Sequence, residues 1–205
     1  MRSRPTFFMK HKILIAVAAA FCAALLPACN FSVFPPESDA QAPRHYVLSD
    51  ETVPVNNATL PQIPFGRISV PSYLDVPQIV TRNGNLVSRS EKNRWGEPLS
   101  RGVARNLALR CAAHAAAVRD KIAIGETERI QVVFERFDGE LDGNVEISAL
   151  YTLIPEKNAA AATSHIFKTT VPVEAPNDYD AYVRTLSRAL DLLAADIVSS
   201  ALLKN

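Results

Sequence analysis

A basic start followed by an uncharged apolar run constrains this chain more than any other feature. Four basic residues among the first 12 precede an apolar run from Ile13 to Leu26. A helix that crosses a bilayer needs about 20 such residues, and this run is shorter. The run has the length of the hydrophobic region of a secretory signal peptide. We therefore expect an export signal here rather than a membrane-spanning helix.

The residues that end the run indicate how the signal is removed. Leu26, Pro27 and Ala28 stand directly before Cys29. This order resembles the bacterial lipobox, in which the cysteine is acylated and becomes the first residue of the processed chain. Pro27 departs from the usual small residue, which leaves the efficiency of processing open. The alternatives are a plain secretory signal with an incidental cysteine, or a short uncleaved anchor.

Three segments follow from this interpretation. We expect residues 1–28 to be a lipoprotein signal peptide and residues 29–44 to be a lipidated, proline-rich tether. Residues 45–205 are then a periplasmic domain. One acyl chain binds a membrane only marginally, but lipoproteins of this type carry more than one, so attachment would be stable. Asn30 replaces the aspartate that retains such proteins in the inner membrane, which favours the outer membrane.

Charge and cysteine content exclude several classes of function. Four of the 22 Lys and Arg lie in the signal, which leaves 18 against 21 Asp and Glu, a net charge of −3. This balance gives no basic surface for nucleic acid. Once the signal is removed and Cys29 is acylated, Cys111 has no partner for a disulfide. No cysteine or histidine motif predicts a metal site, and we expect no cofactor.

Hydrophobic periodicity predicts an α+β fold with a mixed, mostly antiparallel sheet and two main helices packed on one face. The clearest strand alternates apolar and polar residues from Val145 to Leu153. Further strands are expected at 45–48, 65–70, 79–81, 86–88, 129–137 and 165–171. The strands at 129–137, 145–153 and 165–171 should form an antiparallel meander. Asn83-Gly84-Asn85 is a hairpin turn signal.

Two amphipathic helices complete the predicted fold. The first follows Pro98, whose missing N–H is tolerated in a first turn, and it carries an apolar stripe that includes Cys111. Its polar residues Arg101, Arg105 and Asn106 should lie away from that stripe. The second helix should run from about 178 to 202, with Asn177 or Asp178 as its cap. Its expected apolar stripe is Tyr182, Leu186, Ala189, Leu190, Leu193 and Ile197.

The sequence offers no recognisable catalytic motif. A nucleophilic hydrolase needs a serine or cysteine beside an oriented base, and the chain lacks the Gly-x-Ser-x-Gly elbow. His114 is expected to be packed near the helix stripe, and His165 to open a strand. Asp138, Glu140 and Asp142 are interpreted as a solvated acidic turn. We therefore expect a protein that is not an enzyme.

The block from Phe65 to Leu109 resembles a known family. Its pieces are Ile68-Ser-Val-Pro-Ser-Tyr-Leu-Asp75, then Pro77-Gln-Ile-Val-Thr-Arg82, then Arg94-Trp-Gly-Glu-Pro-Leu99. These resemble the ABC-type transport auxiliary lipoproteins. The resemblance implies an outer-membrane lipoprotein facing the periplasm, which works with an MCE-domain protein and an inner-membrane transporter in lipid traffic. It implies no catalytic residue.

The motif residues have two interpretations. Tyr73, Leu74, Asp75, Trp95 and Glu97 either fix the loop and pack over the sheet, or form an exposed patch that binds a partner. Asp75 and Glu97 are expected to cap an element or to pair with Arg82 or Arg94.

Two other functions stay open at this stage. The chain could serve a different envelope machine, in peptidoglycan assembly or secretion, or be a periplasmic hydrolase that uses His114 or His165. Homo-oligomerisation and the identity of the lipid are also open.

Overall fold

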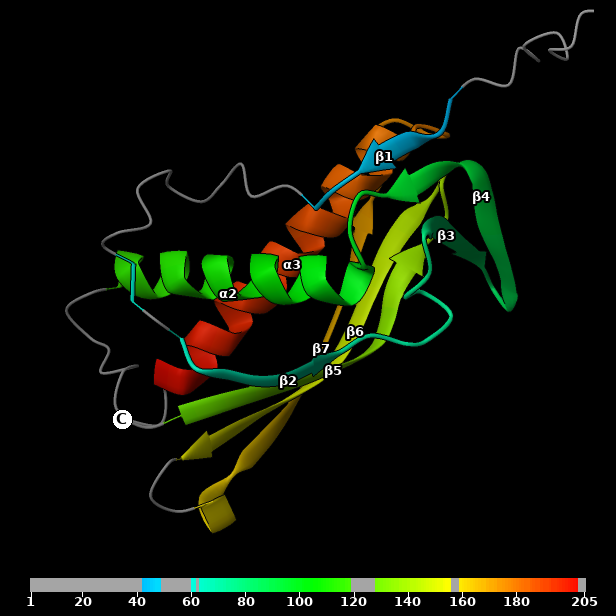
Figure 1. Cartoon of the computed structure of the whole chain (residues 1–205). Coiled ribbons are helices and arrows are strands. Elements are labelled where there is room, and N and C mark those ends of the chain that lie inside the picture. Colours follow the sequence, from blue (N-terminus) through cyan, green and yellow to red (C-terminus); the bar gives the residue numbers. More distant parts are fainter. Residues whose placement is uncertain (1–41, 49–59, 62, 119–127, 156–158, 203–205) are drawn as a thin grey trace, which may run out of the picture. The chain divides into compact units, whose positions relative to one another are not determined.

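Two β-sheets and two long helices make up the described part of the chain (Figure 1). The structure is a computed structural model, and it describes residues 42–48, 60–61, 63–118, 128–155 and 159–202. The predicted signal peptide, Cys29 and most of the tether lie outside these residues. The acidic and basic residues of the domain are spread over seven strands and two helices rather than collected on one element.

The elements follow the predicted order. The strands are β1 (Arg44–Tyr46), β2 (Phe65–Ser69), β3 (Gln78–Asn83), β4 (Leu86–Trp95), β5 (Glu128–Gly139), β6 (Asn144–Pro155) and β7 (Thr163–Pro172). The helices are α2 (Leu99–Ala117), α3 (Tyr179–Leu202) and a short 3-10 turn, η2 (Ala159–Ala161). None of the helices in the described residues is long and apolar enough to span a membrane.

The larger sheet has the strand order β2-β5-β6-β7. β5, β6 and β7 form the predicted antiparallel meander. β2 lies parallel to β5 at the other edge, so the sheet is mixed. A bulge between Phe134 and Arg136 shifts the alternation of β5, so that Phe137 points to the same side as Phe134. The α+β fold class is therefore confirmed.

The smaller sheet has the order β1-β4-β3, where we had expected a single sheet. β3 and β4 form the predicted hairpin, which turns at Gly84 with a φ of 56° that suits glycine. β1 pairs in parallel with the far end of β4, from Arg44 opposite Asn93 to Tyr46 opposite Trp95. Strand periodicity predicts which residues face inward but not which strand is the neighbour, so the second sheet was missed.

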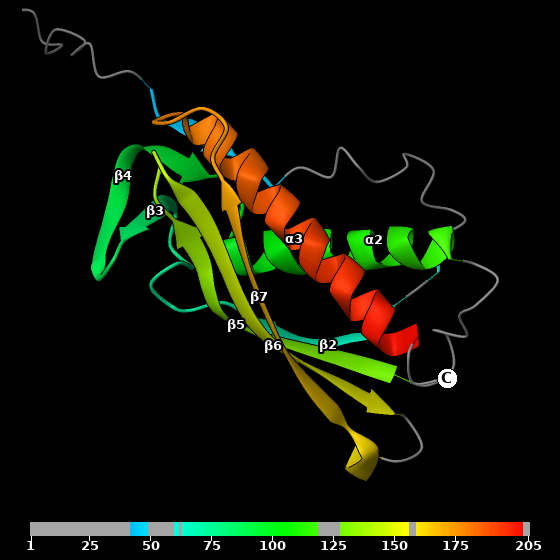
Figure 2. The same cartoon turned by 180° about the vertical axis from the view of Figure 1, so that it is seen from behind.

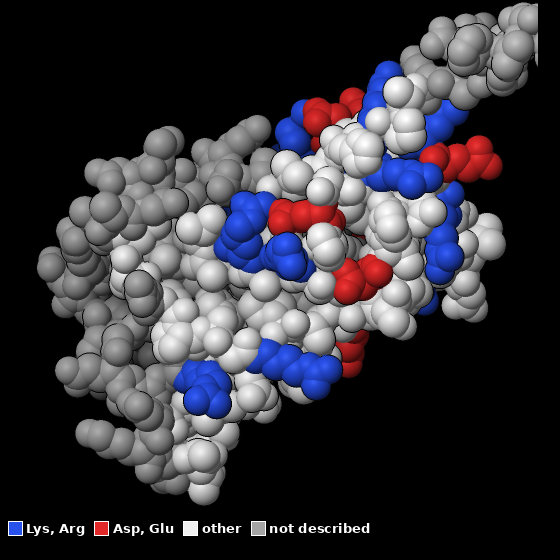
Figure 3. All heavy atoms as spheres, in the orientation of Figure 1, with Lys and Arg blue, Asp and Glu red and all other residues white. Residues whose placement is uncertain are grey.

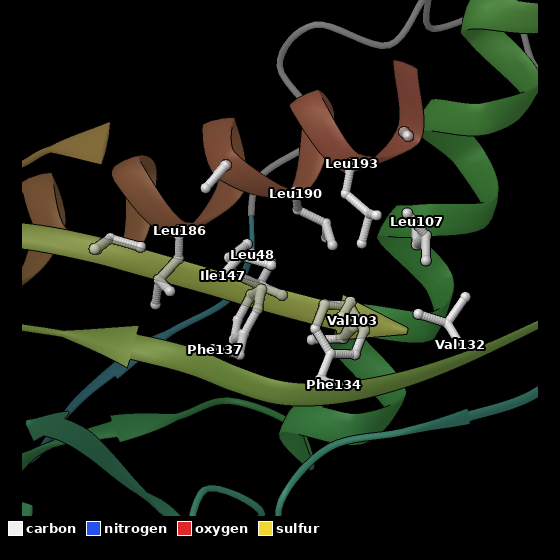
Figure 4. Close-up of a cluster of buried hydrophobic side chains, with 14 of the residues drawn as sticks. Leu48, Val103, Leu107, Val132, Phe134, Phe137, Ile147, Leu186, Leu190 and Leu193 are labelled. Atoms are coloured by element: carbon white, nitrogen blue, oxygen red, sulfur yellow. The ribbon is translucent and has the colours of Figure 1, made fainter. Parts of the chain in front are cut away.

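The two helices cover one face of the four-stranded sheet and pack against each other (Figures 1 and 2). The inward residues of β6 are all buried, namely Val145, Ile147, Ala149, Tyr151 and Leu153. Figure 4 shows Leu186, Leu190 and Leu193 of α3 pointing toward the strands that carry Phe134, Phe137 and Ile147. The predicted stripe of α3 is buried at every position.

The start of α3 confirms one of the two predicted caps. The Asp178 carboxylate accepts a hydrogen bond of 2.8 Å from the backbone N–H of Asp180. Asn177 instead adopts a positive φ of 63° just before the helix. The carboxylates of Asp178 and Asp180 lie at the positive end of the helix dipole, where negative charge stabilises the helix.

The polar side of α2 differs from the prediction at Asn106. Arg101 and Arg105 are exposed as expected, but Asn106 is fully buried. Its amide donates to the backbone carbonyls of Leu48 and Gly102, at 3.3 and 2.9 Å. The asparagine therefore joins α2 to the end of the β1 segment, a contact that helical periodicity does not reveal.

Candidate functional site

Tyr73 of the motif block reaches across the chain to a buried carboxylate. Its hydroxyl donates to Asp138 Oδ2 at 2.6 Å. Arg136 also binds Asp138, with Nη2 at 2.9 Å from Oδ1, and pairs with Glu146. Burial raises the pKa of Tyr73, and the bond to Asp138 raises it further. The hydroxyl therefore stays protonated and able to donate at neutral pH.

Asp138 corrects the interpretation of residues 138–143 as a solvated acidic turn. Asp138 lies within β5, opposite Glu146 of β6, and its side chain is fully buried. The strand continues to Gly139, where a Cβ would collide with the backbone of Asn144. Only the later part of the segment turns, and there Asp142 is exposed as predicted.

Asp75 and Glu97 both stabilise the start of α2. Pro98 provides no side-chain cap for this helix. The Asp75 carboxylate accepts a hydrogen bond of 3.0 Å from the backbone N–H of Ser100, so a residue far back in the sequence takes the role of the cap. Glu97 pairs with Arg105 at 2.5 Å, rather than with the predicted Arg82 or Arg94. The two carboxylates lie at the positive end of the helix, where negative charge is favourable.

Leu74 and Trp95 lie in the core. Leu74 is 1% exposed and Trp95 is 8% exposed. The backbone N–H of Trp95 donates to the carbonyl of Pro77 at 2.8 Å. This bond joins the loop between β2 and β3, residues 70–77, to the end of β4. These placements fit the interpretation that the motif fixes the loop. Partner binding by the motif residues stays a prediction.

The face of the four-stranded sheet opposite the helices carries an exposed apolar row. Val133 of β5 pairs with Leu150 of β6, which pairs with Ile166 of β7. Their exposed fractions are 47%, 38% and 72%. Directly paired residues of neighbouring strands lie on the same face, so the three side chains form a continuous row. Sequence reasoning missed the row because it joins single residues of three separate strands.

Within the described residues, neither His114 nor His165 is hydrogen-bonded to a serine or cysteine. His114 Nε2 lies 3.1 Å from Asp191 Oδ1, which also binds Arg110. His165 stacks on Tyr151 with ring centroids 5.1 Å apart. Its Nε2 is buried and has no hydrogen-bond partner in the described part of the chain.

A second polar cluster lies beneath that histidine. The hydroxyl of Tyr151 donates to Asp196 Oδ2 at 2.7 Å and contacts Ser200 Oγ at 2.8 Å. The cluster joins the buried Tyr151 of β6 to two partly buried side chains of α3. No group of three or more His, Cys, Asp or Glu suited to a metal is found in the described ranges.

One cavity lies between β1, β4 and the start of α3, with a volume of about 400 Å³. Arg44, Lys92 and Asp178 contribute charged groups to its lining. An acyl chain requires an apolar lining, so this cavity does not suit one. Figure 3 shows basic and acidic groups interspersed with uncharged surface on one face of the molecule, which is unlike the basic patch of a nucleic-acid-binding protein.

The fold has counterparts among solved structures. The crystal structure of an uncharacterized protein matches with a TM-score of 0.59 and 16% identity, covering 78% of this chain and 99% of that one. Protein XCC0632 from Xanthomonas campestris matches with a TM-score of 0.56 and 18% identity, covering 78% and 95%. At these identities the likeness shows a shared fold. No curated protein matches the sequence.

A family profile matches residues 46–198, which is well over half of the chain and spans every element from β1 to α3 except the ends. The family is described as the ABC-type transport auxiliary lipoprotein component. The matched range contains the Tyr73–Asp138 contact, the Asp75 cap and the buried Trp95, which together organise the motif block. The chain belongs to the ABC-type transport auxiliary lipoprotein family.

Proposed function

We propose that this protein is an outer-membrane lipoprotein and a non-catalytic component of an MCE/ABC-type system that moves lipid between the two membranes. The observation that carries the proposal is the family match over residues 46–198. A transport auxiliary component acts by binding its transporter rather than by chemistry. The MCE-domain protein is the partner implied by the family resemblance of the motif block.

Membrane attachment is proposed to occur through acyl chains on Cys29. The lipobox-like residues 26–29 support it, and Asn30 supports the outer membrane as the destination. Several buried methylene groups, each contributing about 0.8 kcal/mol, would hold the chain firmly once two or more acyl chains insert. The folded domain then faces the periplasm.

The absence of catalysis is supported by the surroundings of the two described histidines that were candidates. The His114 side chain is engaged with Asp191, and His165 lies against the ring of Tyr151. General base catalysis requires a base within hydrogen-bond reach of the group it deprotonates, and neither imidazole contacts a hydroxyl or thiol nucleophile in this part of the chain.

The test is affinity purification of the cross-linked full-length protein from solubilised membranes, followed by mass spectrometry of proteins and lipids. Cys29→Ala runs in parallel, because it removes the proposed attachment site and changes no residue of the described sheets and helices. We expect the wild-type protein to recover an MCE-domain protein, and the Cys29→Ala protein to be lost from the outer membrane. Recovery of a peptidoglycan or secretion complex instead would overturn the proposal.

A further inference from the structure

The free edge of β7 is a second unusual feature beside the apolar row. β7 is the last strand of its sheet, and within the described residues it pairs with β6 alone. Its pairing runs from Thr163 to Pro172 without a register shift. Such a long, regular edge presents unpaired backbone N–H and C=O groups, and β7 carries a single lysine, Lys168, of the kind of charge that natural proteins use to protect such edges.

The apolar row runs directly into this edge. Ile166 is the outermost member of the row and is 72% exposed, the most exposed large apolar side chain of the described residues. It continues the line of Leu150 and Val133 across the sheet. A strand added beside β7 would therefore find both free hydrogen-bonding groups and an apolar side chain to cover.

Lys168 supplies the charge that such a strand would meet. It lies two residues from Ile166 on the same exposed face of β7, and it makes no ion pair with any described residue. Its neighbour across the sheet is Ser148, whose hydroxyl binds Glu135. β7 itself contains no acidic residue. A second copy pairing through the same edge would offer Lys168 no carboxylate from its own β7.

We propose that β7 binds an extended segment of the MCE-type partner, which joins the sheet as a fifth strand next to β7. The segment places an apolar side chain over Ile166 and a carboxylate beside Lys168. This inference rests on the proposed function for the identity of the partner, and it adds the surface and the mode of binding. Backbone hydrogen bonds supply affinity in this mode, and alternate side chains supply specificity.

The test compares Ile166→Lys with Leu86→Lys in the full-length protein purified from membranes. Leu86 is a matched control, because it is also a strand residue and is 68% exposed, but it lies in the other sheet. We expect recovery of the MCE-domain protein to fall about tenfold for Ile166→Lys, as for loss of a binding hot spot, and to be unchanged for Leu86→Lys. Lys168→Glu should also reduce recovery, with Lys92→Glu as its control.

Hydrogen exchange in the purified complex tests the strand itself. Every second backbone amide of β7 should exchange quickly in the isolated protein and slowly in the complex, because alternate amides of an edge strand face the added strand. Protection confined to side-chain contacts, with no change in the β7 amides, would overturn strand addition.

The outcomes separate the two proposals. If Ile166→Lys recovers the MCE-domain protein as well as the wild type does, the β7 surface is wrong and the proposed function stands. If the wild type recovers no such protein, the proposed function fails, and the assignment of β7 to that partner fails with it. A self-associating wild type whose dimer is abolished by Ile166→Lys would replace the partner with a second copy.

Discussion

The two faces of the four-stranded sheet are built from the same strands but have different surroundings. On the inner face, Ile147 and its neighbours on β6 are buried under α2 and α3. On the outer face, Leu150 and Ile166 are exposed. Only the end of this face near Asp138 is covered, by the loop that carries Tyr73. Apolar side chains therefore lie on both faces of these strands. They contribute to stability only where another element packs over them.

The largest expected effect is on the inner face. Ile147→Ala removes a side chain that is 1% exposed and leaves a cavity under the helices. We expect the free energy of unfolding to fall by about 3 kcal/mol. Chemical denaturation can be followed by the fluorescence of Trp95, which is buried and is the single tryptophan of the sequence. A loss below about 1 kcal/mol would contradict the conclusion that the inner face carries the stability of the sheet.

The covered end of the outer face should behave like the interior. Tyr73→Phe leaves a buried oxygen of Asp138 without its donor at 2.6 Å. We expect a loss of about 2 kcal/mol, as for a hydrogen bond to a charged group. Tyr179→Phe is the control, because the Tyr179 hydroxyl makes no hydrogen bond within the described residues. Equal losses from both substitutions would show that Asp138 does not depend on Tyr73.

Alkaline pH should weaken the helix-covered face. Burial raises the pKa of Tyr182 above its ordinary value of 10.0, with the Asp138 charge adding to the rise. The folded protein therefore holds the phenolic proton at a pH where the unfolded chain releases it. The contribution of Tyr182 to the free energy of unfolding should be fully present below about pH 10. Above about pH 10 the free energy of unfolding should fall by up to about 1.4 kcal/mol per pH unit. Denaturation from pH 9 to 11 measures the slope, which Tyr182→Phe should reduce.

The smallest effect is expected on the open part of the outer face. Ile166→Ala removes a side chain that is 72% exposed, so little apolar surface returns to water. The free energy of unfolding should change by no more than about 0.5 kcal/mol. Paired with Ile147→Ala, this variant makes the same substitution on adjacent strands. A loss as large as that of Ile147→Ala would show that the two faces do not differ.

The pattern of single elements could be predicted from the sequence, whereas their long-range partners could not. The alternation of β6 and the stripe of α3 each depend on nearby residues, and both are confirmed. Asn106 and Asp138 were wrongly assigned to water because polar residues are buried only when distant groups satisfy them. The parallel pairing of β1 with β4 has the same origin, since periodicity carries no information about the neighbouring strand.

The candidate site could be predicted only in part from the sequence, for the same reason. The motif block was found as a set of residues close in sequence, and the structure shows that Asp75 caps α2 and that Trp95 lies in the core. The row of Val133, Leu150 and Ile166 needs the register of three strands. A one-residue shift of register would send every one of these side chains to the opposite face, so no local pattern could have identified the row.

The short β1 ladder has a mechanical consequence. β1 pairs with β4 over only three residues, and the chain that leads toward the proposed anchor enters the domain through it. Tension on that chain acts first on this ladder and on the buried Leu48, not on the long pairing of β5 with β6. Detachment of residues 44–48 alone would lengthen the connection by up to about 17 Å while the four-stranded sheet stays folded. With the proposed lipid anchor, the distance between membrane and domain would thus depend on whether this three-residue ladder stays paired.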